Sequence, residues 1–115
     1  MSQLNLNLIQ GSVRINFDPK AAQDLQKHIA ALMSSLKASA IAVGERQSRP
    51  EPKATMEYRY SDGIFFEVFC NPNIYPSPFA AKVLLTIKDD KIRLTSEAEL
   101  TQLREDIERY LESNA

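Results

Sequence analysis

Two glutamates and an arginine near the middle of the chain are the first residues whose spacing suggests chemistry. Glu57, Arg59 and Glu67 share one phase of two segments that alternate polar and apolar residues around Ser61-Asp62-Gly63. If that turn is a three-residue loop, Glu57 lies opposite Glu67. Two facing carboxylates repel, which raises the pKa of one of them and suits acid/base chemistry. On a solvated face, screening and the nearby Arg59 reduce this repulsion, and the pair then has no catalytic meaning.

The same loop length pairs Tyr60 with Ile64 and Tyr58 with Phe66, and it gathers apolar side chains and Cys70 on the opposite face. Gly63 then supplies the left-handed residue that the turn requires. A small-molecule-binding protein or small enzyme would take its polar groups from both segments, in a pocket between sheet and helices: Glu57, Tyr58, Arg59, Tyr60 and Glu67.

Cys70 and His28 are the only cysteine and histidine, and a thiol and an imidazole can act as nucleophile and base. Cys70 follows the apolar phase of its segment, so we expect a buried, un-ionised thiol instead. His28 lies on the flank of an apolar helical stripe, where a structural histidine is the simpler interpretation. One Cys and one His cannot close a Cys/His zinc site, and the three isolated glycines form no phosphate loop. We therefore expect no catalytic residue, metal or cofactor.

The segment of about 71–81 is the most unusual in the chain, because it combines three prolines with Ile74, Tyr75 and Phe79. Connections of this length are usually more polar. Prolines limit the conformations of a free loop, so these three side chains suit presentation to a partner. We favour the simpler interpretation of these side chains, in which Ile74 and Phe79 cover one end of the core. The sequence does not decide whether the Tyr75-Pro76 bond is cis.

Phe65 and Phe69 lie on the same phase as Glu67, on a face that should be solvated. Two phenylalanines there form an apolar patch, which is either covered by the chain or used for contact. Aromatic residues beside Arg59 also suggest stacking of single-stranded bases, as a weaker alternative. The segment lacks the glycines and the positive charge of an RNA-recognition motif, so we do not expect nucleic acid.

Alternation of period two opens the chain over residues 4–17, and its phase slips by one residue at Gly11. A slip of this kind indicates either a β-bulge in one long strand or a tight turn between two short strands. We favour the bulge. A helix should follow from Asp18-Pro19 to about residue 39. Residues 40–43 either continue this helix to Gly44 or form a short strand.

Residues 82–95 form a second predicted hairpin, in which a two-residue Asp89-Asp90 loop puts Ile87 opposite Ile92. The last helix should begin at Ser96, because Ser96 and Glu99 have the spacing of a capping box. The predicted order is β-α-β-β-β-β-α, an α+β fold with an antiparallel sheet of about five strands and two helices packed on it. Residues 1–115 form one domain, with a polar, mobile connection over about 44–54 and the Pro-rich loop over about 71–81.

The composition limits the classes of function that the protein can have. The chain of 115 residues has 14 Lys and Arg, 15 Asp and Glu and a net charge of −1, so generic affinity for nucleic acid or anionic membranes is not expected. Its start lacks the features of a signal peptide, and no apolar stretch is long enough to span a membrane. We expect a cytoplasmic, non-catalytic module for protein-protein interaction, or an accessory subunit of an assembly. Its partner should be another protein, with a second copy of the chain as a further candidate.

Overall fold

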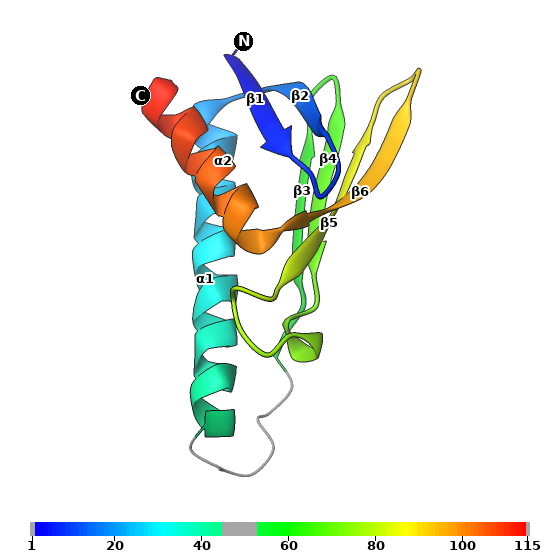
Figure 1. The fold of residues 1–115 in the computed structure, drawn as a ribbon. Helices are drawn as coiled ribbons and strands as arrows, with labels where there is room; N and C mark the ends of the chain where they lie inside the picture. Colours follow the sequence, from blue (N-terminus) through cyan, green and yellow to red (C-terminus); the bar gives the residue numbers. More distant parts are fainter. Residues whose placement is uncertain (1, 45–52, 115) are drawn as a thin grey trace.

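The computed structural model describes residues 2–44 and 53–114, and side chains over 2–38 and 53–114. Within these ranges the chain has an α+β fold, as expected from the sequence (Figure 1). Most of the predicted connection over 44–54 lies outside the described residues. The elements are β1 (Ser2–Asn7), β2 (Ser12–Phe17), α1 (Pro19–Gly44), β3 (Met56–Ser61), β4 (Phe65–Cys70), the 3-10 helix η1 (Pro72–Ile74), β5 (Lys82–Lys88), β6 (Arg93–Glu99) and α2 (Leu100–Ser113).

The described strands form two antiparallel sheets rather than the single sheet of about five strands that we expected. One sheet has four strands in the order β3-β4-β5-β6, and the other is the hairpin β1-β2. Both helices lie on the same side of the four-stranded sheet, and the hairpin fits between α2 and the upper part of that sheet (Figure 1). The hairpin joins the larger sheet through a bond of 3.1 Å from the amide of Ile9 to the carbonyl of Glu97.

The preference for one bulged strand over residues 4–17 is wrong, and the alternative of a tight turn is correct. Leu4 pairs with Ile15 and Leu6 with Val13, so the chain reverses direction. Gly11 has a φ of +92°, a left-handed conformation that glycine adopts without strain. Each even-numbered residue of β1 lies opposite an odd-numbered residue of β2, so the apolar residues of both strands lie on the same buried face. The slip in the alternation is therefore the signature of this turn.

Helix α1 begins as the sequence predicts and ends later than residue 39. The Asp18 carboxylate accepts a hydrogen bond of 2.8 Å from the amide of Ala21, which satisfies one of the free amides of the first turn. The helix continues to Gly44, so residues 40–43 are helical. One stripe of α1 is buried against the sheet and α2, at Ala22, Leu25, Ile29, Leu32, Met33 and Leu36.

Both hairpins of the larger sheet have the predicted faces but a register two residues away from the prediction. In the first, Tyr60 lies opposite Phe66 and not Ile64, and Ser61 lies opposite Phe65. A shift of two residues keeps every side chain on its face because the side-chain period of a strand is two. Gly63 has a φ of +72°, which confirms the predicted left-handed residue.

The second hairpin closes with the four residues 89–92 instead of the two-residue Asp89-Asp90 loop. Ile87 therefore pairs with Leu94, and Ile92 lies in the loop. The Asp89 carboxylate accepts hydrogen bonds from the amides of Lys91 and Ile92, at 2.8 and 2.9 Å. These two bonds lower the pKa of Asp89 below its ordinary value and favour the longer loop.

The predicted capping box at Ser96 is wrong, because Ser96 belongs to β6 and pairs with Leu85. Strand pairing continues to Glu99, and Ala98 is buried opposite Val83. Helix α2 begins at Leu100, whose amide donates a bond of 3.0 Å to the carbonyl of Ala81. The longer strand pairing and this bond replace the side-chain cap.

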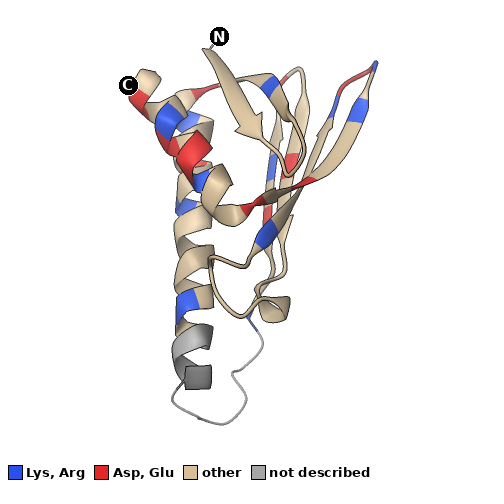
Figure 2. Ribbon diagram, in the orientation of Figure 1, with Lys and Arg blue, Asp and Glu red and all other residues tan. Residues whose placement is uncertain are grey.

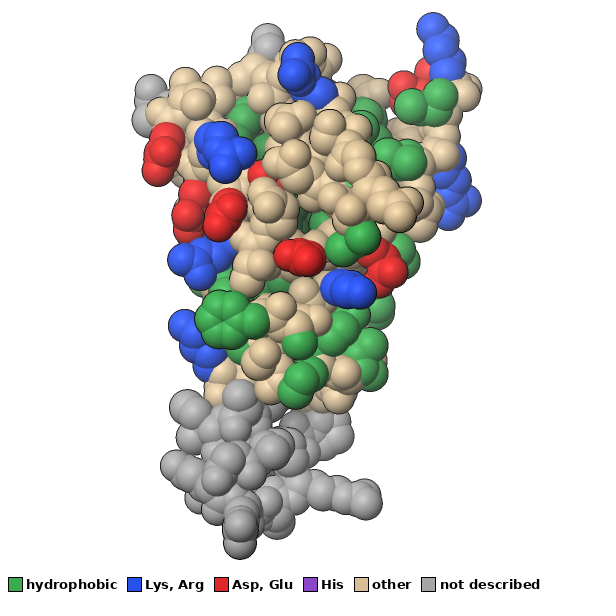
Figure 3. Space-filling view, in the orientation of Figure 1, with side chains coloured by type: hydrophobic (Ala, Val, Ile, Leu, Met, Phe, Trp, Pro, Cys, Tyr) green, Lys and Arg blue, Asp and Glu red, His purple; other side chains and the backbone are tan. Residues whose placement is uncertain are grey.

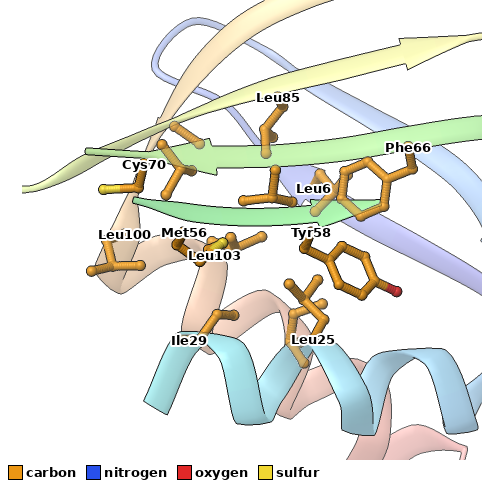
Figure 4. Packing of buried hydrophobic residues seen from close by; sticks show 14 of the residues in the cluster. Leu6, Leu25, Ile29, Met56, Tyr58, Phe66, Cys70, Leu85, Leu100 and Leu103 are labelled. Atoms are coloured by element: carbon orange, nitrogen blue, oxygen red, sulfur yellow. The ribbon is translucent and has the colours of Figure 1, made fainter. Parts of the chain in front are cut away.

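The core lies between the inner face of the larger sheet, the two helices and the hairpin (Figure 4). Phe17 is at the centre of an aromatic group, with ring centroids 4.8 Å from Tyr60, 5.7 Å from Phe66 and 5.9 Å from Tyr110. Such edge-on and tilted arrangements are favourable between aromatic rings. Neither helix, as far as it is described, has the length and apolar character needed to cross a membrane.

Candidate interaction surface

The outer face of the larger sheet, the side away from the helices, does not contain the predicted pair of facing carboxylates. In the observed register Glu57 lies opposite Phe69, and Arg59 lies opposite Glu67. Arg59 Nε is 2.7 Å from Glu67 Oε2, and a terminal guanidinium nitrogen is 3.8 Å from Glu57 Oε2. The hydrogen bond to Glu67 raises the pKa of Arg59 above its ordinary value. The two carboxylates therefore share one arginine, which offsets one of their two charges, and they do not face each other as the predicted acid/base pair would.

The tyrosines of the predicted polar cluster lie on the inner face, so the structure does not bring the five residues together. Tyr58 donates a hydrogen bond of 3.2 Å to the carbonyl of Ala21, and Tyr60 donates one of 3.2 Å to Asp18 Oδ2. Burial raises the pKa of Tyr58, and burial with the bond to Asp18 raises that of Tyr60 to about 12. Both hydroxyls attach β3 to the start of α1, which is a structural role.

Cys70 and His28 have separate structural surroundings. Cys70 is buried at the end of β4, and burial raises its pKa to about 11, so the thiol is un-ionised near neutral pH. His28 Nδ1 is 2.9 Å from the carbonyl of Asp24, and its ring packs edge-on against Tyr58 with 5.5 Å between centroids. Over the described ranges, no group of three His, Cys, Asp or Glu side chains has the arrangement of metal ligands.

The Pro-rich loop, residues 71–81, has a well-defined hydrogen-bonded base. Asn71 Oδ1 accepts bonds from the amide and the side-chain nitrogen of Asn73, at 3.1 and 2.9 Å. The Asn73 side chain also donates to the carbonyl of Lys53 and accepts from its amide, at 2.8 and 2.7 Å. Pro72 and Pro78 are buried. These contacts hold the loop against the residues before β3 and fix its backbone.

Two of the three large apolar side chains of this loop are exposed. Phe79 keeps 83% of its surface exposed and Ile74 keeps 66%, whereas Tyr75 is partly buried against the core. Ile74 and Phe79 therefore do not cover the end of the core. The Tyr75-Pro76 bond is trans, since no cis bond occurs among the described residues. Figure 3 shows hydrophobic side chains gathered over the segment between β4 and β5.

Phe65 and Phe69 are half-buried on the outer face, and the Arg59–Glu67 pair lies between them. Lys88 Nζ lies 4.9 Å from the centre of the Phe65 ring, a favourable cation-π distance. Phe69 lies beside Leu84 of β5, which is also exposed. No described helix covers this side of the sheet (Figure 1). The outer face thus carries two small apolar areas separated by an ion pair.

Asp106 is a buried carboxylate that the sequence reasoning missed. It is 3% exposed and accepts three hydrogen bonds of 2.8 to 2.9 Å, two from Asn7 and one from Gln102. A guanidinium nitrogen of Arg109 lies 3.8 Å away. The bonds attach β1 to α2. The sequence could have revealed this carboxylate, because Asp106 lies between Leu103 and Ile107 on the apolar stripe of the helix, where an apolar residue is expected.

A hollow of about 510 Å³ between α1 and α2 was also missed. Met33 and Ala30 contribute apolar surface, and Lys37 and Arg104 contribute positive charge. Arg104 Nε donates a bond of 3.1 Å to Glu108, so its charge is paired. The hollow contains no converging set of catalytic groups.

No family model matches the chain, and neither a curated protein nor a solved structure is found to be similar to it. The function therefore has to be argued from the surface just described.

Proposed function

We propose that the protein is a non-catalytic interaction module, or an accessory subunit of a larger assembly, that binds another protein through its Pro-rich loop. The observation that carries this proposal is the exposure of Phe79 and Ile74 on a loop with a fixed base. Exposed apolar side chains that gather in one area, as they do over this loop (Figure 3), mark sites of contact. A loop that is already ordered loses little conformational entropy on binding, which favours affinity.

The outer face of the larger sheet offers a second contact area beside the loop. Phe65 and Phe69 are half-buried there, and Leu84 adds exposed apolar surface. A partner that covers both the loop and this face would bury the apolar groups at Phe69 and Leu84 together with those of the loop, beside the Arg59–Glu67 ion pair. The single buried thiol supports a reducing compartment such as the cytoplasm.

Catalysis and nucleic-acid binding have less support. The five residues of the polar cluster lie on two faces of the sheet, with Tyr58 and Tyr60 bonded to α1 and its start. Lys and Arg residues are dispersed among acidic ones over the elements, without a continuous basic area in this view (Figure 2). Both features favour a partner recognised by apolar contact.

Site-specific photo-crosslinking in the native cell tests the proposal. A benzophenone amino acid at position 79 should give a discrete crosslinked protein, and one at position 92 should not. Ile92 is a suitable control because it is 61% exposed but lies in the loop between β5 and β6. The added change Ile74→Ser should remove the crosslink from position 79.

The stability of the variants completes the test. Phe79→Ala should change the free energy of unfolding by only about 0.5 kcal/mol or less, as expected for an exposed site. Equal crosslinking from positions 79 and 92, or none from position 79, would contradict the proposal. A large loss of stability would show that Phe79 supports the core instead.

A further inference from the structure

Strand β3 is an edge of the larger sheet with unpaired backbone groups. The amide of Asp62 donates to the carbonyl of Ile64, which marks the first hydrogen-bonded pair of the β3-β4 hairpin. Hydrogen-bonded pairs alternate along an antiparallel ladder, so Tyr58 and Tyr60 bond to β4. Glu57 and Arg59 then direct their N–H and C=O groups away from β4. A free row of this kind is a template for another strand.

The other edge of this sheet is partly occupied. The carbonyl of Glu97 in β6 already accepts a bond from Ile9, at the turn between β1 and β2. An added strand on β6 would meet this turn after a few residues. Among the described residues, no hydrogen bond engages the free-edge backbone groups of Glu57 and Arg59. The edge of β3 is therefore the better site for strand addition.

We propose that β3 pairs with β3 of a second copy of the chain, antiparallel and about a two-fold axis at Tyr58. Glu57 of each copy then lies directly opposite Arg59 of the other. The four-stranded sheets join into one sheet of eight strands. This proposal does not depend on the binding of a partner by the Pro-rich loop.

The charges of β3 favour this register over the two registers that differ from it by two residues. Moving the second strand by two residues in one direction puts Arg59 opposite Arg59, and moving it in the other puts Glu57 opposite Glu57. Like charges directly opposite on a sheet are destabilising, and opposite charges are favourable. The side chains are accessible for this pairing, since those of Glu57 and Arg59 are 51% and 63% exposed. Arg59 would then lie between its own Glu67 and Glu57 of the second copy.

The ends of the same register bring no like charges together. Asp62 of one copy falls opposite Ala54 of the other, next to Lys53. Both Asp62 and Ala54 are exposed, and Lys53 is partly exposed. The two-fold axis repeats the contact between Glu57 and Arg59, so each interface contains two pairs of opposite charge directly across from each other. Complementary charges of this kind specify a register more than they add affinity.

Helix α1 leaves room for the second copy. The flank of α1 above the β3 edge carries the small side chains Ala31 and Ser35, which line a hollow of about 300 Å³ together with residues from 53–57. His28 and Leu32 line the same hollow, and the His28 ring packs against Tyr58, so these larger side chains border the space where the second copy would enter. In the proposed dimer both α1 helices lie on the same side of the joined sheet. The small residues Ala31 and Ser35 allow these helices to approach beside His28.

Charge reversal tests the register by light scattering or sedimentation. We expect the wild type to have twice the mass of the 13.0 kDa chain at high micromolar concentration. Glu57→Arg or Arg59→Glu should weaken the dimer at least tenfold, because each variant places like charges opposite each other. An equimolar mixture of the two variants should restore a dimer, since every opposed pair is again complementary. Arg93→Glu, a matched reversal on the exposed β6 edge, should have no effect.

Circular dichroism shows whether each variant is folded, and the double variant Glu57→Arg/Arg59→Glu provides an independent check. It exchanges the two charges within one chain and should dimerise by itself. A wild type that stays monomeric at millimolar concentration would overturn the proposal. So would a dimer that neither reversal weakens, or a mixture and a double variant that both stay monomeric.

Discussion

The two faces of strand β4 have similar residue types and opposite surroundings. Phe66 on the inner face is fully buried between the sheet, Phe17 and Tyr58, whereas its neighbour Phe65 on the outer face is half-buried under Lys88. The helices cover only one side of the sheet (Figure 1). Stability is therefore concentrated on the inner face, which leaves the outer face and the loops available for contacts. Four predictions test how far this division holds.

The largest difference should appear between Phe66→Ala and Phe65→Ala. Removing the buried ring leaves a cavity in the core, which should lower the free energy of unfolding by about 3–5 kcal/mol. Removing the half-buried ring should cost about 1 kcal/mol, from lost contact with Lys88 and partial burial. Urea denaturation of both variants measures the comparison. Equal losses would show that the outer face is also part of a core.

Asp106→Asn should have the next largest effect, because it tests a polar group on the buried side. The carboxylate accepts bonds from Asn7 and Gln102 with both oxygens. An amide in its place keeps one accepting oxygen and turns an NH2 group toward at least one of these donors. We expect a loss of about 2–3 kcal/mol, since unsatisfied buried polar groups are costly. Glu108→Gln, which loses an exposed contact to Arg104, should cost about 0.5 kcal/mol or less. A loss no larger for Asp106 than for Glu108 would contradict this view.

Tyr60 should make stability depend on alkaline pH. Burial and the bond to Asp18 raise its folded pKa to about 12, from an ordinary value of 10.0. A raised pKa favours the protonated form in the folded state, so this contribution is present below pH 10 and is lost as the pH rises toward 12. Unfolding measured across this range should show a smaller loss for Tyr60→Phe than for the wild type. An identical pH profile would mean that Tyr60 titrates normally.

The smallest effect should come from Glu67→Gln on the outer face. Its partner Arg59 is largely exposed, and exposed ion pairs contribute little to stability. We expect the free energy of unfolding to change by about 0.5 kcal/mol or less, measured in the same urea series. A loss above about 2 kcal/mol would be typical of a buried pair and would make the two faces energetically alike.

Alternation and helical spacing were enough to predict the α+β class, both helices and the inner faces of both larger hairpins. The register was not readable from them, because Tyr60 stays on the same face whether it pairs with Ile64 or Phe66. The register depends on the length of the loop. In the second hairpin the Asp89 carboxylate favours a four-residue loop by accepting bonds from two loop amides, and the alternation of polar and apolar residues contains no sign of these bonds. Ser96 and Glu99 have the spacing of a capping box, but the pairing of Ala98 with Val83 continues β6 past Ser96, so the helix begins later.

The candidate surface was predicted in part. The unusual composition of residues 71–81 identified the loop, but the sequence left two alternatives for Phe79, and its exposure excludes the one in which it covers the core. The polar cluster depended on a register that was wrong by two residues. Glu57 opposite Phe69, with Arg59 opposite Glu67, has a different chemistry from two facing carboxylates.

The attachment of β1 to α2 has a consequence for synthesis on the ribosome. The helix that packs beside Leu4 and Leu6 is translated about a hundred residues after them, and its Asp106 and Tyr110 bond to Asn7 and Ser2. Contacts so distant in sequence form late in folding. Until α2 leaves the exit tunnel, the apolar side of the first hairpin lacks its cover. During translation the apolar side of this hairpin is therefore open to non-native contacts until α2 is available.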